Sequence, residues 1–338
     1  MRRNRATFYV DTLHSYRGES TVAINLPAIG ASTEKSGHGR HEKLPSAAAD
    51  LCSAAPGTVD LGSVDIGSVD IGSVDIGDFI GESFLFLGAG STVLLQLAFP
   101  GVGHGVADHS STLHRPMDRL RTTMTYVYAV TLGTPDERRA IVRMVNKAHV
   151  PVHSEPDGSG TTVPYNAFDP QLQLWVAATL YKNGATLYER FFGPLDDASA
   201  ERLYQQSAVY GTALQVKPDQ WPATREEFEA YWQHTLDTLE VDDKVRRYVH
   251  ALLHGGDSPW IVRLGLPLNR FVTTGLLPQR VRDELELPWG PRDQRRFDRL
   301  MTTLPKAYRL VPRRVRWLPS SYYLWDMRRR LRGGRHLI

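Results

Sequence analysis

The chain has 338 residues, 41% of them hydrophobic and 23% charged, which is ordinary for a globular protein with a sizeable core. Its single cysteine, Cys52, excludes an intrachain disulfide framework, thiolate zinc sites and cysteine-held iron–sulfur clusters, so any metal should have nitrogen or oxygen ligands. The net charge of +3 is uneven, because the segment from Arg292 to the end carries 14 Lys and Arg against 3 Asp and Glu, a local charge of +11, which leaves −8 on the preceding 291 residues.

Residues 1–77 show no sustained hydrophobic period and are predicted to form a disordered leader. The first residues are basic but lack an apolar run, so we expect no secretory signal. The leader ends in four pentads, TVDLG-SVDIG-SVDIG-SVDIG, whose period fits neither a helix nor a strand and whose number is too small for a solenoid. We interpret them as a repeat expansion in a linker. The alternative is calcium binding by four evenly spaced aspartates, although they lack the ligand spacing of calcium loops: Asp60, Asp65, Asp70 and Asp75.

Residues 83–107 contain no charged side chain. Because GAGST and FPGVGHG interrupt this stretch, it predicts a buried helix at 84–98 and then a glycine-rich turn, rather than a membrane span. The turn carries His104, Asp108 and His109. Polar groups at the end of a buried helix can line a pocket, with Asp108 as a proton acceptor. Alternatively, Asp108 caps the following turn and the histidines are exposed.

From Asp78 onward the apolar spacing is helical and strand-like alternation is nearly absent. Capping residues and periodic apolar positions predict helices at 118–132, 134–149, 169–192, 195–214, 224–239 and 241–253. Shorter helices are expected beyond these, separated by prolines at 259, 267, 278, 288, 305, 312 and 319. The sequence therefore predicts one large all-α domain over 78–319, followed by a basic tail over 320–338.

Two helices carry polar side chains that could bind a ligand. In the first, Arg119 and Thr123 are four residues apart, so a guanidinium and a hydroxyl share one face that suits a carboxylate. In the second, Thr134 and Glu137 form a capping box, and His149 lies on the apolar stripe eight residues after Ile141. A neutral imidazole in that position is suited to axial ligation of a haem iron. The alternatives are an exposed arginine and a hydrogen-bonded core histidine.

The basic C-terminus suggests contact with an anionic membrane surface, the alternative being a solvated helical face and a frayed end. Nucleic acid is not an expected partner, because RNP-type aromatic motifs, zinc-finger spacing and Walker glycines are missing. We expect a cytoplasmic protein that associates with membranes peripherally.

Three segments resemble one family when taken together and in order: ESFLFLGAGSTVLLQLAFPGVGHGVADHS, RPMDRLRTTMTYVYAVTLGTPDERRAIVRMVNKAH and YNAFDPQLQLWVAATLYKNGATLYERFFGPL. They are similar to the MpaB-type oxygenases, a family that includes the catalytic domain of the rubber oxygenase latex clearing protein. The resemblance covers roughly residues 81–318 and leaves residues 1–77 outside. It implies an all-helical protein with a globin-like core that binds haem b and uses dioxygen to cleave double bonds in isoprenoid chains.

The resemblance also implies roles for individual residues. His149, followed three residues later by Val152, matches the axial iron ligand, and Arg119 and Thr123 match the haem-pocket helix. Thr122 occupies the position of a distal lysine in the rubber oxygenases, so a lysine-capped resting state is not expected here. Asp108 and His109 match the polar end of the glycine-rich segment and are the expected distal acid–base groups.

Two positions depart from the family pattern: Phe99 and Ala177 stand where many members have a histidine. Such losses could alter the substrate, weaken haem retention or abolish activity. The expected function is nevertheless a haem b-dependent oxygenase that acts on an apolar, isoprenoid or lipid-like substrate. The alternatives are peroxidase-like or dehydrogenating chemistry on the same haem, and a non-catalytic helical protein that binds a lipid or a partner.

Overall fold

The computed structural model describes residues 74–109, 116–155, 163–255 and 260–334. By its contacts the chain divides into two units, 1–66 and 67–338, and every described residue belongs to the second. Cys52 and the predicted leader up to Ser73 lie outside the described residues. Of the four regularly spaced aspartates only Asp75 is described, and its side chain accepts a hydrogen bond from the Asp78 amide at 2.9 Å. Asp75 thereby caps the first helix, α1 (Ile76–Ile80).

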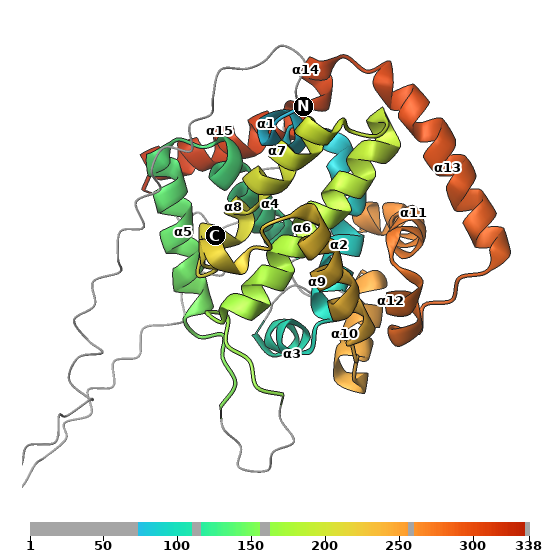
Figure 1. The fold of residues 1–338 in the computed structure, drawn as a ribbon, viewed down its shortest axis with the longest axis horizontal. Coiled ribbons are helices and arrows are strands. Elements are labelled where there is room, and N and C mark those ends of the chain that lie inside the picture. Colours follow the sequence, from blue (N-terminus) through green and yellow to red (C-terminus); the bar gives the residue numbers. More distant parts are fainter. Residues whose placement is uncertain (1–73, 110–115, 156–162, 256–259, 335–338) are drawn as a thin grey trace, which may run out of the picture. The chain divides into compact units, whose positions relative to one another are not determined.

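The described residues form helices, and one isolated bridge pairs His153 with Asn166 (Figure 1). The prediction of an all-α fold is therefore confirmed for them, while a globin-like arrangement stays a prediction. After α1 the order is η2 (Ser83–Gly88), α2 (Ala89–Leu97), α3 (Pro100–His109), α4 (Pro116–Leu132), α5 (Pro135–His149), α6 (Pro170–Phe192), α7 (Asp197–Ser207), α8 (Val209–Thr212), η3 (Pro218–Gln220), α9 (Arg225–Asp237), α10 (Asp243–Leu253), α11 (Trp260–Leu276), α12 (Gln279–Glu284), α13 (Pro291–Arg309), α14 (Arg313–Arg316) and α15 (Leu318–Arg332).

Helix α6 runs through the core and contacts η2, α2, α7, α8 and α13 (Figure 1). It begins after Asp169, whose side chain accepts a hydrogen bond from the Gln171 amide at 2.8 Å, with Pro170 in the first turn. Trp175 is fully buried in its middle, where the indole Nε1 donates to the Leu95 carbonyl oxygen at 3.0 Å. The Trp175 ring stacks on Trp232 at a centroid distance of 5.0 Å, which ties α2, α6 and α9 together.

The segment predicted as a glycine-rich turn is instead helix α3, so that prediction is wrong. A Cβ at Gly103 would overlap the carbonyl oxygen of Leu97, and one at Gly101 would lie 2.8 Å from Leu172. The glycines therefore let α3 pack tightly against its neighbours, and this close packing outweighs their poor intrinsic helix propensity. Helix α3 is bent by 104° relative to the stretch Ser83–Leu97.

Two prolines predicted to separate short helices lie inside longer ones: Pro267 in α11 and Pro305 in α13. Each proline removes one backbone hydrogen bond. In α13, however, the buried stripe of Phe297, Met301 and Pro305 packs on the rest of the fold and keeps the helix continuous. The stretch predicted as one helix over 195–214 is divided between α7 and α8.

Among the described residues no single helix is long and apolar enough to cross a membrane; only the bent pair Ser83–Leu97 and Pro100–His109 meets the length and composition criteria jointly. Much of that pair is buried inside the fold, including Leu94, Leu95 and Leu97. The basic segment set apart as a tail over 320–338 contains most of α15, which packs along α4.

Candidate functional site

His149 is the last residue of α5, whose predicted cap is confirmed. The Thr134 hydroxyl accepts from the Glu137 amide at 3.3 Å, and Glu137 Oε2 accepts from the Thr134 amide at 2.9 Å. Arg328 of α15 pairs with Glu137 at 2.7 Å. Together with the burial of Ile141, these contacts fix the start and the inner face of α5 and so fix the position of His149 at its end.

The imidazole of His149 is half-buried and lies edge-on to the ring of Phe168, with centroids 6.3 Å apart. Its Nδ1 is buried and has no hydrogen-bond partner among the described residues. Burial, and secondarily the positive charge of Arg119, lower the pKa of His149 to about 4. The ring is therefore neutral at pH 7, the form in which histidine binds metals.

Arg119 and Thr123 lie one turn apart on α4, as predicted. The Arg119 side chain is accessible and makes no hydrogen bond or ion pair in the described part of the chain, yet burial lowers its pKa. The guanidinium is therefore open to solvent or to a ligand, while the surrounding protein partly desolvates it. Its charge acts on His149, and Tyr248 of α10 raises its pKa slightly. The structure therefore places Arg119 near both residues.

Two further hydroxyl groups belong to this region. Thr123 is half-buried with no recorded hydrogen bond, and the hydroxyl of Tyr248 is buried without a partner among the described residues. By contrast, Thr122 is buried and its hydroxyl donates to the Asp118 carbonyl oxygen of its own helix at 2.9 Å. Buried polar groups without partners are uncommon, so several near one unpaired arginine indicate space for a polar or charged ligand. Tyr248 was not predicted from the sequence, because it shares no motif with α4 or α5.

Asp108 and His109 lie at the end of α3, and the structure connects them through Tyr165. The Tyr165 hydroxyl donates to Asp108 Oδ2 at 3.0 Å, and His109 Nε2 lies 3.0 Å from the same hydroxyl oxygen. Because the Tyr165 proton is committed to Asp108, His109 must donate through Nε2, which leaves its Nδ1 free. Lys244 of α10 pairs with Asp108 Oδ1 at 2.5 Å. Tyr165 lies 57 residues from Asp108 and was not predicted.

The environment of Asp108 makes it a weaker base than the sequence suggested. Burial raises its pKa, but the hydrogen bonds from Lys244 and Tyr165 outweigh burial, and the pKa is lowered overall. Burial and the bond to Asp108 raise the pKa of Tyr165 to about 12, so the phenol stays protonated. Asp108 is thus an ionised anchor for Tyr165, and His109 is the group with a free ring nitrogen.

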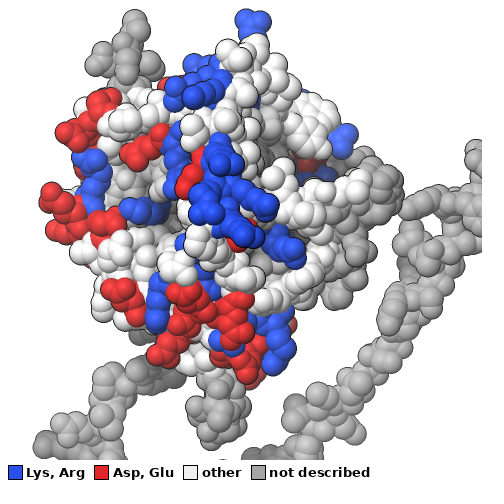
Figure 2. Space-filling view, turned by 90° about the vertical axis from the view of Figure 1, so that its right-hand side faces the viewer, with Lys and Arg blue, Asp and Glu red and all other residues white. Residues whose placement is uncertain are grey.

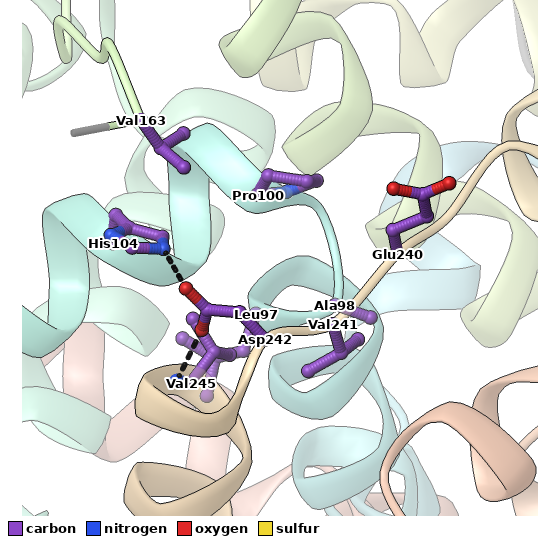
Figure 3. A pocket seen from close by; sticks show the side chains of 9 residues that line it. All are labelled: Leu97, Ala98, Pro100, His104, Val163, Glu240, Val241, Asp242 and Val245. Carbon is purple, nitrogen blue, oxygen red and sulfur yellow. Dashed lines mark hydrogen bonds and ion pairs between the residues drawn. The ribbon is translucent and has the colours of Figure 1, made fainter. Parts of the chain in front are cut away.

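A pocket of about 300 Å³ lies beside this network, between the start of α3 and the start of α10 (Figure 3). His104 and Asp242 point toward each other across it, with Nε2 and Oδ2 2.8 Å apart. Asp242 also caps α10 by accepting from the Val245 amide at 2.9 Å. The sequence allowed His104 to be either exposed or part of a pocket, and the structure shows it buried in the pocket lining. Neither His149 nor Arg119 lines this pocket, so the site residues fall into two polar regions, one around His149 and Arg119 and one around Asp108 and His104.

Two described stretches after His149, residues 150–155 and 163–167, pair with each other and lie against α3. Val152 follows His149 by three residues, and the Ala167 amide donates to its carbonyl oxygen at 2.9 Å. A Cβ at Gly105 of α3 would meet Tyr165 at 3.3 Å and Val152 at 3.6 Å. Side chains that follow His149, the predicted iron ligand, therefore pack directly on α3, the helix that carries Asp108 and His109.

Phe99 and Ala177, the two residues that depart from the family pattern, both pack in the core. The Phe99 ring lies 5.8 Å from that of Trp175 and extends the aromatic stack of the core. Ala177 is fully buried. A Cβ added at Gly211 of α8 would lie 3.2 Å from the Cβ of Ala177. Helix α8 thus approaches too closely for a histidine at position 177 without rearrangement.

The desolvation of His149 predicts a pH dependence of stability in the haem-free protein. Its pKa is about 4 when folded and about 6.5 when unfolded. Above pH 6.5 the residue is neutral in both states and titration contributes nothing. As the pH falls from 6.5 toward 4, the unfolded chain binds the proton first, so the free energy of unfolding should decrease by about 2 kcal/mol between pH 7 and pH 5. Urea unfolding at both pH values should show this loss in wild type and in a His153→Gln control, but not in His149→Gln. Equal losses in all three proteins would contradict the burial of His149.

Comparison with known proteins is consistent with these observations. The family described as "ER-bound oxygenase mpaB/B'/Rubber oxygenase, catalytic domain" matches residues 78–306. An uncharacterized protein of Mycobacterium tuberculosis and one of Mycobacterium bovis are each 41% identical to this chain over 253 residues, covering 73% of it and 98% of the relative. No solved structure matches it.

Proposed function

This chain belongs to the MpaB and rubber oxygenase catalytic-domain family, and on that basis we propose that it is a haem b-dependent oxygenase. We propose further that it uses dioxygen on an apolar, isoprenoid or lipid-like substrate. The observation that carries the haem proposal is the neutral, unpartnered imidazole of His149 beside the unpaired guanidinium of Arg119.

The residues present fit haem b. The described residues contain no group of three or more His, Cys, Asp and Glu side chains that could hold a bare metal ion. A porphyrin supplies four nitrogens itself, so a single histidine such as His149 is a sufficient protein ligand. Arg119, desolvated and without a carboxylate partner, matches a haem propionate. The hydroxyl groups of Thr123 and Tyr248 are available to the same ligand.

When bound, haem supplies the chemistry with dioxygen, and the protein supplies binding and orientation. His149 would hold the iron through its neutral ring, because burial keeps the ring from protonating at pH 7. Arg119 would orient the porphyrin by its propionate. Thr122 offers no competing ligand, because its hydroxyl bonds to the backbone of α4.

We propose that His109 transfers protons during the reaction and that Asp108 positions it through Tyr165. His109 is exposed, and its Nδ1 has no hydrogen-bond partner among the described residues, while Lys244 holds Asp108 ionised. A base oriented by a fixed second group is the usual arrangement for general acid–base catalysis.

A His109→Ala variant is therefore expected to keep its haem but to consume oxygen about 100-fold more slowly with squalene as the isoprenoid substrate. Tyr165→Phe should show a smaller loss and a shifted pH profile, because it frees His109 from its partner without removing the imidazole. Oxygen-electrode rates normalised to haem content would measure both. Unchanged rates in His109→Ala would remove His109 from the mechanism.

The alternative, a non-catalytic lipid- or partner-binding protein, is supported by the packing of Phe99 and Ala177 at positions where many relatives have a histidine. The visible spectrum of the purified protein distinguishes the two functions. A Soret band that shifts on reduction and carbon monoxide binding supports the oxygenase. Its absence after expression with sufficient iron and haem precursor supports the binding protein.

We also propose peripheral contact with an anionic membrane. The contact surface would consist of Leu310, α14 and α15. This surface exposes large apolar side chains, with Leu310 84% exposed and Trp325 51% exposed, as well as Val315, Leu318 and Tyr322. Arginines border them, including Arg313, Arg314 and Arg329. Exposed aromatic and aliphatic groups among cations are typical of membrane-surface binding.

Co-sedimentation with phosphatidylglycerol vesicles should weaken when Leu318 and Trp325 are both changed to serine. It should also weaken at high salt, because the arginines contribute through screened charges. Equal sedimentation of wild type and the double variant would contradict membrane contact through this surface.

A further inference from the structure

A second pocket, of about 350 Å³, lies between α6, α11, α12 and α13. Its lining includes three basic side chains, Lys182, Arg190 and Arg282, and no acidic one. None of its lining residues belongs to the haem-site proposal or to the His104 pocket. The pocket is therefore a separate feature of the fold.

Arg282 is a buried cation without a counter-ion. It is only 8% exposed, and all its recorded acceptors are neutral: Gln279 Oε1, at 3.2 Å from Nε and 2.8 Å from Nη2, and the Thr274 carbonyl oxygen at 3.2 Å. Among the described residues it forms no ion pair, and the only acidic neighbour that acts on it does so at a distance. Burial lowers its pKa, and the charge of Asp283 offsets only part of that effect. A buried charge without an ionic partner is costly unless a ligand supplies one.

Arg190 and Arg282 each pack on one ring of a pair of aromatic residues, Phe297 and Trp289. The guanidinium of Arg190 lies over the Phe297 ring at 5.6 Å, and that of Arg282 lies over the Trp289 ring at 5.4 Å. The two rings meet edge-on with centroids 5.9 Å apart. Arg190 has no recorded hydrogen bond or ion pair in the described structure, whereas Lys182 is paired with Glu229. Two unpaired guanidinium groups therefore flank one pocket.

Apart from Glu229, which pairs with Lys182, the acidic side chains near this pocket form no ion pair with its basic residues in the described structure. Asp283 accepts from Gln279 Nε2 at 2.6 Å and Asp298 accepts from Gln294 Nε2 at 2.8 Å, and neither carboxylate lines the pocket. In Figure 2, Lys and Arg side chains gather in the centre and upper part of the face shown, while acidic side chains gather at its left and lower edges. The outer face of α13 exposes Arg292, Arg295, Arg296, Arg299, Lys306 and Arg309. These exposed cations attract anions to the side of the fold that carries α13.

We propose that this pocket binds a small organic oxyanion, a carboxylate or phosphate monoester carried on an apolar group, through Arg190 and Arg282. Guanidinium groups bind such oxyanions by charge-assisted, forked hydrogen bonds. Arg282 keeps two N–H groups beyond those recorded as donating. The apolar part of the ligand would contact Leu95, Trp232 and Leu276, which also line the pocket.

Isothermal titration of the purified protein with hexanoate, with inorganic phosphate and with hexanol tests the proposal. Hexanoate or phosphate should bind, and hexanol should bind far more weakly. Tighter binding of hexanoate indicates a carboxylate on an apolar chain, and tighter binding of phosphate indicates a phosphate monoester. Arg190→Gln should weaken binding about tenfold or more, because it removes a charged donor.

Arg296→Gln is the matched control, since Arg296 is exposed on α13 and does not line the pocket. It should bind the anions as wild type does. Because Arg190 is exposed, its variant should fold normally, and circular dichroism would check this. Three results would overturn the proposal: no heat with either anion, equal weakening in Arg190→Gln and Arg296→Gln, or hexanol binding as tightly as hexanoate. The haem content of both variants should stay unchanged, which separates this test from that of the oxygenase.

Discussion

We expect the wild-type protein to purify with haem and a His149→Ala variant to purify without it. The charge of Arg119 acts on the His149 ring, and the low pKa of His149 keeps that ring neutral and able to bind iron. Removing the proposed iron ligand should reduce haem affinity by about 100-fold or more, since even the loss of groups that only orient a metal ligand typically costs 10–100-fold. The measurement is the Soret absorbance per mole of protein, supported by the pyridine haemochrome assay.

His153→Ala is the matched control for this experiment. His153 lies four residues further along the chain, is exposed, and pairs with Glu155 at 3.1 Å. Its variant should retain the Soret band. Added imidazole should restore part of the band in His149→Ala, which a purely structural role for His149 would not allow. An identical Soret band in His149→Ala and wild type would exclude His149 as the ligand.

Arg119 offers an independent check on the same site. Arg119→Gln keeps the helical position but removes the charge that matches a propionate, so haem should be retained with weaker affinity rather than lost. A loss of haem in His149→Ala together with partial retention in Arg119→Gln would support the two roles separately.

Trp175→Ala is expected to have the largest effect on stability. The indole is fully buried, stacks on Trp232 and donates a hydrogen bond to the Leu95 carbonyl oxygen. Replacing it with alanine leaves a cavity at the junction of three helices and an unpartnered carbonyl, at a cost of about 3–5 kcal/mol. Urea unfolding at pH 7, followed by circular dichroism, would measure the change in the free energy of unfolding.

Trp325→Ala provides the control, because Trp325 is half-exposed on α15 and contacts mainly Tyr322 and Arg329. Its loss should change the free energy of unfolding by about 0.5 kcal/mol or less. A similar change in both variants would mean that the stack around Trp175 does not hold α2, α6 and α9 together.

The sequence predicted most of the long helices because their signals are local. Thr134 with Glu137, and Asp169 with Pro170, determine where α5 and α6 begin, since a cap depends only on residues three positions away. The same local signals failed where packing decides. Gly101 and Gly103 indicated a turn, but close contacts with Leu172 and Leu97 make that segment helix α3. Pro305 likewise remains inside α13 because its helix is held by the buried stripe around it.

The candidate site divides in the same way. The sequence by itself determined that His149 lies at the end of a capped helix and that Arg119 and Thr123 share one face, because helical periodicity fixes both. Only the tertiary structure decided what surrounds them. Tyr165, Lys244 and Tyr248 reach Asp108 and Arg119 from distant segments, and no local pattern encodes such pairings. These partners decide the chemistry: they hold Asp108 ionised and commit the Tyr165 proton. The charge and burial around His149 keep its ring neutral, because pKa values depend on the neighbours that folding brings together.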